Sequence, residues 1–442
     1  LSYFWNVVAS TDGNHTIRLK AMDSLGNPTE DPRQVIVSLA PPAAPAITSH
    51  VESQTTPTYL VNVSGTAPLF TTVILKVNNV VVGTTQTTGT SGTGAFSFPN
   101  VALVEGNNAL AVKAGHRGGE SAYAPDYGIA VDTGAPPAPQ NLAGQVLAGG
   151  LIRFTWTKGA GEVPTGYNLY MGTSAFTTIA GATKTNTTPI AYPYTEHNPG
   201  DDGLKYYAVT ALDSAGNESP ISGLVSLSSD RANPSVVTIQ YTQNSEVLAS
   251  NSAAGPGSVE VAVTVSEKLK ELPFFSLEPQ EGSPIVVTMN KGDDTHYAGT
   301  FAVTAQSPQG PTIYKFSGKD MVGNRGNAQG TGITIDVQGP VAAIQSPRTT
   351  LQINPDPVTV TLALNEASVT TPALTLKASD NSTSLVSGMT STDSGIHWSG
   401  TVGISGLSEG KAEFILSEAT DALGNIGTTL SSGRYLLLYR NG

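Results

Sequence analysis

The chain has 442 residues, a formal net charge of −12 and no cysteine. The negative charge argues against nucleic acid or an anionic membrane as a partner. The lack of cysteine excludes disulfides, cysteine-based zinc sites and thiol catalysis. Glycine (47) and proline (29) are plentiful, and no stretch of 18 apolar residues predicts a membrane-spanning helix. Because no window has a sustained 3.6-residue apolar period, the composition predicts an all-β protein.

The N-terminal residues, 1–39, are predicted to be the C-terminal half of an immunoglobulin-like sandwich. Strands are expected at 3–8, 17–21 and 35–37, and the chain starts at Leu1 without a methionine, as an internal piece of a longer protein would. Half a sandwich leaves its apolar face open. The missing strands are therefore expected from upstream residues or from another chain.

A five-residue turn, Asp-x-x-Gly-Asn, follows the second of these strands and occurs four times. Its aspartate can accept backbone N–H groups two residues on, and its glycine supplies the positive φ that closes a hairpin. The spacing of 190, 107 and 101 residues indicates tandem domains of about one hundred residues, with one copy missing. The four turns begin at Asp23, Asp213, Asp320 and Asp421.

The second unit, 40–132, follows the proline-rich segment 41–45 and is predicted to be another immunoglobulin-like sandwich. Its segments 59–63, 73–77, 96–98 and 109–112 alternate apolar and polar residues at period two, as strands do. Asn78-Asn79 predicts a tight turn. Where the aspartate turn is expected, this unit has His116 in a glycine-rich segment instead.

The third unit, 133–230, resembles a fibronectin type III domain. The resemblance rests on the proline-rich start 136–142, the strand 152–156 ending in Trp156, and the strands 166–170 and 206–211. It implies a sandwich with the tryptophan in its core. Lys205 stands where that family usually has a corner tyrosine.

The fourth and fifth units, 231–338 and 339–442, are sisters: six positions recur 101 residues apart, from His296 and His397 to Asn324 and Asn425. With the second unit and the N-terminal half, they resemble bacterial immunoglobulin-like domains of surface proteins. The predicted fold class is therefore all-β: tandem immunoglobulin-like and fibronectin type III β-sandwiches in an elongated array. Asp132, Asp230 and Asp336 each precede a proline by four residues, which predicts short, stiff links.

These links suggest one candidate metal chemistry. In a sandwich of this kind, the last hairpin and the loop after the second strand lie at the end where the preceding link arrives. We therefore expect three carboxylates to lie together at each junction. One junction would have Asp230, Glu267 and Asp320, and the next would have Asp336, Glu366 and Asp421. Asp132 and Asp213 would meet at a third, with Glu162. Three carboxylates with backbone carbonyls suit Ca²⁺. The simpler alternative is that each aspartate serves only its own turn, so that no bound metal is needed.

No catalytic constellation is found: the six histidines are scattered, and there is no nucleophile elbow, P-loop or dinucleotide fingerprint. The expected function is a non-enzymatic extracellular or cell-surface array: a stalk, filament or surface-layer component, or adhesin shaft, without a cofactor. Its partners would be copies of itself, neighbouring surface proteins and glycans. The alternatives are accessory modules of a large secreted enzyme, or ligand binding by exposed aromatics. The candidates for ligand binding are Tyr167, Tyr170, Tyr192 and Tyr194, although most of them are expected to pack in the core instead.

Overall fold

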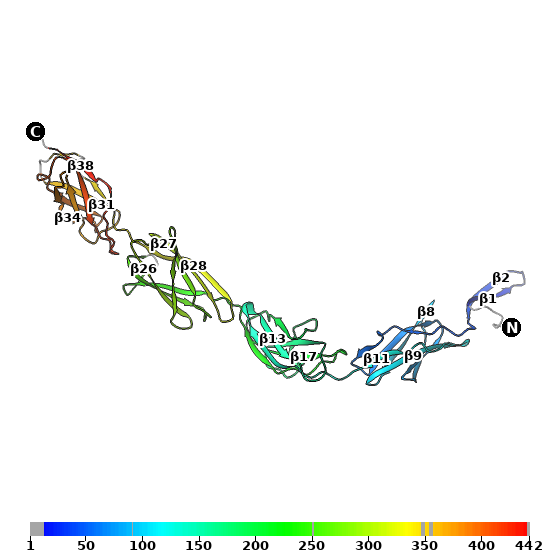
Figure 1. Cartoon of the computed structure of the whole chain (residues 1–442). Helices are drawn as coiled ribbons and strands as arrows, with labels where there is room; N and C mark the ends of the chain where they lie inside the picture. The colour runs from blue at the N-terminus through cyan, green and yellow to red at the C-terminus, as the bar shows by residue number, and fades with distance from the viewer. Residues whose placement is uncertain (1–12, 91, 250–251, 346–349, 353–356, 440–442) are drawn as a thin grey trace. The chain divides into compact units, whose positions relative to one another are not determined.

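The computed structural model describes residues 13–90, 92–249, 252–345, 350–352 and 357–439. It divides into two compact units, Leu1–Val146 with Leu151–Ser229, and Leu147–Gly150 with Asp230–Gly442. The described residues contain β-strands and two short 3₁₀ turns, η2 (Ala148–Gly150) and η3 (Ile179–Gly181), and no α-helix (Figure 1). The predicted strand at 3–8 lies outside the described residues.

The first unit begins with a two-stranded hairpin, β1 (Gly13–Met22) and β2 (Pro28–Val37), closed by the Asp23 turn. Ile17 and Leu19 point from β1 as exposed side chains, 46% and 69% accessible. The equivalent positions before the Asp213 turn are Tyr207 and Val209, which are fully buried. The hairpin therefore has the pattern of a core-forming pair of strands whose apolar face is open among the described residues.

The next sandwich packs a three-stranded sheet, which includes β8 (Thr93–Ala102), against a larger one, which includes β9 (Gly106–His116) and β11 (Tyr127–Val131). These three strands are labelled in Figure 1. Its core contains the inward residues of the predicted strands, such as Val63, Leu75 and Leu110. Asn78 and Asn79 have φ of 49° and 68°, which confirms the predicted tight turn. The first sheet is β3 (Ala46–Ile47), β5 (Leu60–Pro68) and β8 (Thr93–Ala102). The second is β4 (Gln54–Thr56), β11 (Tyr127–Val131), β9 (Gly106–His116), β6 (Thr72–Val77) and β7 (Val80–Gln86), with β10 (Gly119–Glu120) on β9.

The third sandwich has a three-stranded and a four-stranded sheet, and a sandwich is what its resemblance to fibronectin type III implied. Trp156 lies in the core, 5.2 Å from Tyr167 between ring centroids. Lys205 is buried, and its Nζ contacts Asp201 Oδ2 at 2.7 Å. The sheets are β12 (Gln140–Val146), β13 (Ile152–Thr157) and β16 (Tyr194–His197), and β15 (Thr183–Lys184), β14 (Gly166–Gly172), β17 (Gly203–Leu212) and β18 (Val225–Ser229).

The second compact unit, which contains Asp230–Gly442, has two sandwiches, each with two five-stranded sheets. In the first of them, β22 (Gly257–Val265) buries every second residue, as a half-buried strand should: Val259, Val261, Val263 and Val265. One sheet is β20 (Glu246–Val247), β19 (Val236–Gln243), β22 (Gly257–Val265), β26 (His296–Val303) and β25 (Met289–Lys291). The other is β21 (Ala253–Ala254), β28 (Arg325–Ile335), β27 (Gly310–Lys319), β23 (Phe274–Pro279) and β24 (Ile285–Val287).

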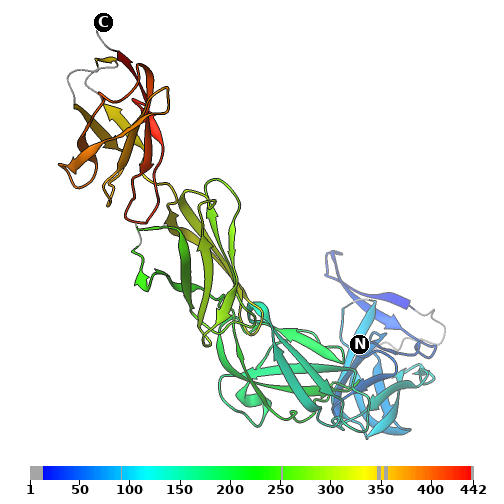
Figure 2. The same ribbon diagram turned by 60° about the vertical axis from the view of Figure 1, so that its left-hand side comes forward.

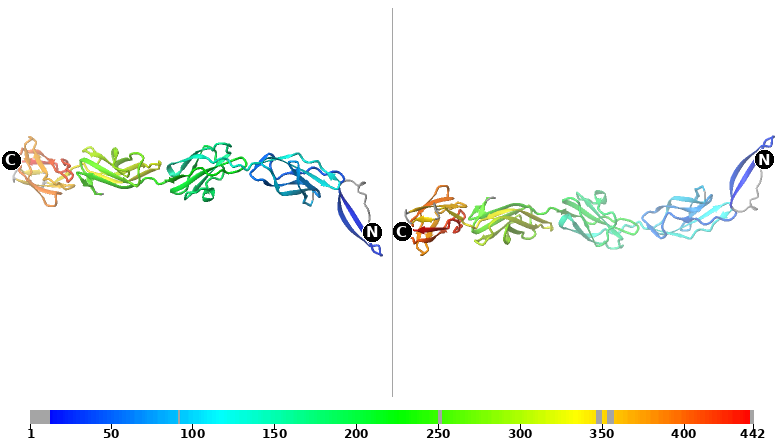
Figure 3. Two further views of the ribbon diagram at one scale, coloured as in Figure 1. Left: turned by 90° about the horizontal axis from the view of Figure 1, so that it is seen from below. Right: turned by 90° about the horizontal axis from the view of Figure 1, so that it is seen from above.

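The C-terminal sandwich repeats this plan, and its two layers are visible at the red end of the chain in Figures 2 and 3. Phe414, Leu362 and Leu376 form part of a continuous core between the sheets. One sheet is β34 (Ser387–Ser391), β35 (His397–Val402), β31 (Val358–Leu364), β29 (Ala342–Gln345) and β37 (Leu430–Ser432). The other is β30 (Thr350–Gln352), β38 (Tyr435–Tyr439), β36 (Gly410–Glu418), β32 (Ala373–Lys377) and β33 (Thr383–Leu385). The predicted all-β class of tandem immunoglobulin-like and fibronectin type III sandwiches is confirmed.

Candidate metal centres at the linker aspartates

The repeated turn has the geometry that its sequence predicts. Asp421 Oδ1 accepts the N–H groups of Leu423 and Asn425, both at 2.8 Å, and its Oδ2 accepts Asn425 Nδ2 at 2.8 Å. Gly424 has a φ of 86°, which explains the glycine. Asp23 and Asp320 accept the same two N–H groups of their own turns, whereas Asp213 Oδ1 accepts those of Gly216 and Asn217.

Burial separates the first copy of the turn from the other three. Asp213, Asp320 and Asp421 are only 3%, 1% and 4% exposed, whereas Asp23 is exposed. A buried carboxylate is costly unless it is paired or hydrogen-bonded. The backbone N–H groups of the turn donate hydrogen bonds to Oδ1 of each of these three carboxylates.

Each linker aspartate directly follows a strand, and two of them, Asp132 and Asp336, continue the hydrogen-bond ladder of that strand. Asp132 N–H donates to Thr56 O of β4, and Asp336 N–H donates to Ala254 O of β21, each at 3.0 Å. Each side chain also accepts a backbone N–H two residues on: Gly134 N–H to Asp132 Oδ1, Ala232 N–H to Asp230 Oδ1 and Gln338 N–H to Asp336 Oδ1. The links are thus ordered by local hydrogen bonds of their own.

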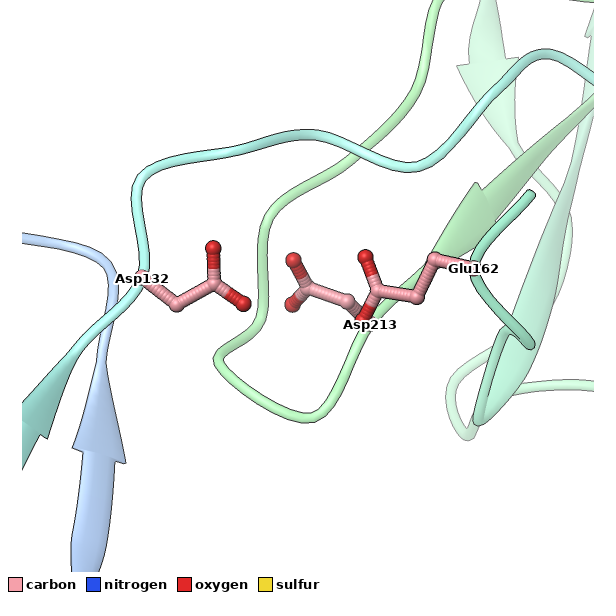
Figure 4. A group of neighbouring side chains, drawn as sticks. All are labelled: Asp132, Glu162 and Asp213. Atoms are coloured by element: carbon pink, nitrogen blue, oxygen red, sulfur yellow. The ribbon is translucent and has the colours of Figure 1, made fainter. Parts of the chain in front are cut away.

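The structure brings the predicted carboxylates together in three clusters of one design. Each cluster joins a half-buried linker aspartate, a glutamate and a buried turn aspartate, with one carboxylate oxygen of each within 4.8 Å of the others. We name them the Asp132 cluster (Asp132, Glu162, Asp213), the Asp230 cluster (Asp230, Glu267, Asp320) and the Asp336 cluster (Asp336, Glu366, Asp421). Figure 4 shows the first, with Asp132 and Asp213 reaching toward each other from separate loops and Glu162 beside them.

The pKa values of two of the glutamates are raised in these clusters. Burial raises the pKa of Glu267, and the neighbouring Asp230 and Asp320 raise it further. Burial and the charges of Asp336 and Asp421 likewise raise the pKa of Glu366. In the Asp230 and Asp336 clusters, the nearby like charges therefore disfavour the ionised form of the glutamate, and a bound cation would relieve that repulsion.

We did not predict from the sequence that the asparagine at the end of the turn also contacts the linker aspartate. Asn217 Nδ2 donates to Asp132 O at 2.7 Å, Asn324 Nδ2 to Asp230 O at 3.1 Å and Asn425 Nδ2 to Asp336 O at 3.0 Å. The sequence carries a signal for this contact, because the asparagine is present in every copy of the turn. However, its local bond to the turn aspartate already offers a sufficient reason for it.

The second sandwich uses different chemistry at the equivalent place. Gly118 N–H donates to His116 Nδ1 at 2.8 Å, so the imidazole hydrogen is on Nε2, which lies 2.8 Å from Ser38 Oγ. Ser38 stands in the link that precedes this sandwich. A neutral hydrogen bond thus replaces the carboxylate cluster where the linker aspartate and the aspartate turn are both missing.

The other candidate residues lie apart from the clusters. Tyr167 and Tyr170 are buried, 2% and 6% exposed, so an exposed aromatic platform made of all four tyrosines is wrong; Tyr192 and Tyr194 remain half-exposed. His296 and His397 each contact an aspartate on the surface, Asp293 and Asp393.

No family model matches the chain. Over 108 residues it is 36% identical to chitinase A1 of Niallia circulans, which is 24% of this chain and 14% of that protein. The chain therefore spans a small part of that relative.

Solved structures with a similar fold include a Ca²⁺-stabilised adhesin with which an Antarctic bacterium binds ice. It is 16% identical, with 89% of this chain and 100% of that chain covered, at a TM-score of 0.30. Fibronectin(III)-like modules of Clostridium thermocellum CbhA are 16% identical, with 42% and 94% covered, at 0.29. The titin fragment I67–I69 is 10% identical, with 70% and 100% covered, at 0.29.

Within the described residues, we find no helix with the length and apolar character needed to span a membrane.

Proposed function

We propose that this chain is a non-enzymatic, extracellular or cell-surface structural array, acting as a stalk, filament or surface-layer component, or adhesin shaft. The observation that carries the proposal is the recurrence of one carboxylate cluster at the same place in three successive sandwiches. A catalytic site is normally built once in a chain. A feature repeated with the domain period serves the connection of the domains instead.

Calcium is the ion that these clusters would take. Their donors are hard carboxylate oxygens, which suit Ca²⁺, and three negative charges at close range favour a divalent ion. When bound, the ion would neutralise the cluster and tie the linker aspartate to the turn aspartate and the glutamate. Asp336, Glu366 and Asp421 would hold one ion, and the Asp132 and Asp230 clusters the others.

Calcium titration of the chelator-stripped chain tests this part of the proposal. Millimolar Ca²⁺ is expected to raise the melting temperature, and isothermal titration calorimetry is expected to give three sites per chain. The triple variant Glu162→Gln, Glu267→Gln, Glu366→Gln should lose most of this response. A control with Glu246→Gln and Glu418→Gln, two exposed glutamates outside the clusters, should keep it. An unchanged melting temperature in the parent chain at millimolar Ca²⁺ would overturn the calcium proposal. Each aspartate would then serve only its own turn.

The structural role itself is tested by electron microscopy of the purified chain and of the native cell surface. Extended particles or fibres that react with antibodies against the chain would support an array. Detection only as part of a larger secreted hydrolase would overturn it.

A second candidate function is an accessory module of such an enzyme, and the partial likeness to a chitinase favours it. In this reading, Tyr192 and Tyr194 are the aromatic side chains available to an external ligand, being 50% and 55% exposed. A pull-down on insoluble chitin and a glycan array would test it, with Tyr192→Ala and Tyr194→Ala as the variants. The matched control is Tyr435→Ala, an exposed tyrosine in the C-terminal sandwich.

A further inference from the structure

The backbone of each linker aspartate is held from both sides at two junctions that lie inside a single compact unit. Asp336 donates its N–H to Ala254 O of the preceding sandwich, and its C=O accepts Asn425 Nδ2 of the following one, both at 3.0 Å. Asp132 repeats the arrangement with Thr56 O at 3.0 Å and Asn217 Nδ2 at 2.7 Å. One residue thus bridges two sandwiches through its main chain alone.

The asparagine that makes this bridge is itself fixed. Asn425 is 5% exposed, and the same Nδ2 also donates to Asp421 Oδ2 at 2.8 Å. Asp421 is in turn held by the N–H groups of its own loop, so the turn itself fixes the orientation of the Asn425 side-chain amide toward the linker. Asn217 has the same second bond, to Asp213 Oδ2 at 2.8 Å, and it also reaches Gly134 O at 3.2 Å.

A steric contact four residues along the link supports the same docking. A Cβ at Gly427 would lie 1.9 Å from Pro340 O, so the proline of the Asp-x-x-x-Pro link lies directly against the segment that leaves the turn. The sister position, Gly326, is 1.7 Å from Pro234 O by the same measure. Only glycine allows this approach.

The first copy of the turn serves as an internal comparison. Asn27 makes the local bond to Asp23 Oδ2 at 3.0 Å, and its side chain is exposed. Among the described residues, the side chain of Asn27 therefore has the local bond of the turn and no hydrogen bond to a linker backbone.

We propose that Asn217 and Asn425 are positioning residues that clasp the linker backbone to the following sandwich, with or without a metal ion. The clasp sets the direction in which the chain crosses from one sandwich to the next. It also places the carboxylates of Asp132 and Asp336 in their clusters, and this second consequence rests on the proposed calcium function.

The test uses the full chain, which has no cysteine of its own and can be spin-labelled at two introduced sites. Glu260→Cys on β22 and Thr359→Cys on β31 place labels on exposed, equivalent positions of the two sandwiches in the second unit. Double electron–electron resonance in chelator should give a narrow distance distribution for the parent. It should give a clearly broader one for Asn425→Ala, and an unchanged one for Asn27→Ala.

A distribution for Asn425→Ala as narrow as that of the parent would overturn the clasp. If that variant does not fold, Asn425→Asp keeps the shape of the side chain and removes the Nδ2 donor, and the same comparison applies. Calcium affinity is the second readout, because a group that orients a metal ligand usually affects affinity 10- to 100-fold. Asn425→Ala should weaken one of the three sites about tenfold. If the parent binds no calcium, the proposed metal function fails while the distance measurement still decides the clasp.

Discussion

Glu366 and Asp336 hold carboxylate oxygens within 4.8 Å of each other, although Glu366 follows β31 of the C-terminal sandwich and Asp336 follows β28 of the preceding sandwich. Asp421 completes the group from a third loop. Three like charges collected from three segments cost folding free energy in the absence of a counter-ion.

Neutralising this glutamate should therefore have opposite effects with and without calcium. In chelator, Glu366→Gln is expected to raise the melting temperature of the C-terminal sandwich, because the raised pKa of Glu366 means that its ionised form is disfavoured in the folded state. In millimolar Ca²⁺ the variant should melt below the parent. Differential scanning calorimetry in both buffers checks this, with Glu418→Gln as the control. A variant that is less stable than the parent in chelator would show that Glu366 stabilises the metal-free fold.

Glu218 is expected to stabilise the third sandwich at neutral pH. Its Oε1 accepts hydrogen bonds from Asn168, Tyr170 and Thr210, which tie the segment after the Asp213 turn to the outer face of β14 and β17. Glu218→Ala should cost about 1–3 kcal/mol, since it leaves these donors without their acceptor. Urea unfolding followed by hydrogen exchange and mass spectrometry localises the effect, with Glu246→Ala as the exposed control.

The same network gives a pH dependence of known sign. Burial alone would raise the pKa of Glu218, but the hydrogen bonds outweigh it and the pKa is lowered. A carboxyl group with a lowered pKa in the folded state contributes stability above its unfolded value of 4.5, and this is lost as the pH falls. The difference in stability between parent and Glu218→Ala should therefore shrink below pH 4.5.

The sequence predicted the carboxylate clusters because each part of them follows from local chemistry at a fixed spacing. Asp421 and Gly424 belong to one turn, and Asp336 precedes Pro340 by four residues. The loops that bring them together follow from the order of strands in the sandwich. The role of Asn425 could not be read in this way, since a long-range bond to Asp336 O adds no constraint on residue type beyond the local one.

Core packing was expected for most of the four candidate tyrosines, but the sequence did not show which of them are buried. Tyr167 and Tyr170 lie on the same strand three residues apart and so point to opposite faces of the sheet. Both are buried because a second layer covers the outer face: Tyr170 packs with Phe176 from the following loop. Alternation predicts one buried side of a strand, and it does not show that a loop folds over the other.

The packing of the C-terminal core predicts a large difference between two neighbouring residues. Phe414 is 1% exposed between the sheets, whereas Ile415 points outward from the same strand and is 41% exposed. Phe414→Ala should destabilise this sandwich by about 3–5 kcal/mol, because it removes apolar contacts and leaves a cavity. Ile415→Ala should change stability by about 0.5 kcal/mol or less. Chemical denaturation of both variants provides the comparison, and equal losses would contradict the two-layer core.

His197 should make the third sandwich sensitive to mild acid. It ends β16, its ring centroid lies 6.2 Å from that of Tyr207, and its Nε2 is buried without a hydrogen-bond partner. Burial lowers the pKa of His197 below 6.5, so the unfolded chain binds the proton more tightly than the folded one. Stability is therefore present above pH 6.5 and falls as the pH is lowered through the folded-state pKa.

His197→Phe keeps an aromatic ring at this position and removes the titrating group. Hydrogen exchange at pH 7 and pH 5, corrected for intrinsic rates, should show that the parent loses protection in β13 and β17 at the lower pH and that the variant loses less. His296→Asn, which removes an exposed imidazole from another sandwich, should respond like the parent in these strands. If His197→Phe loses as much protection as the parent, the acid sensitivity arises elsewhere, and the carboxylate network of Glu218 becomes the next group to replace.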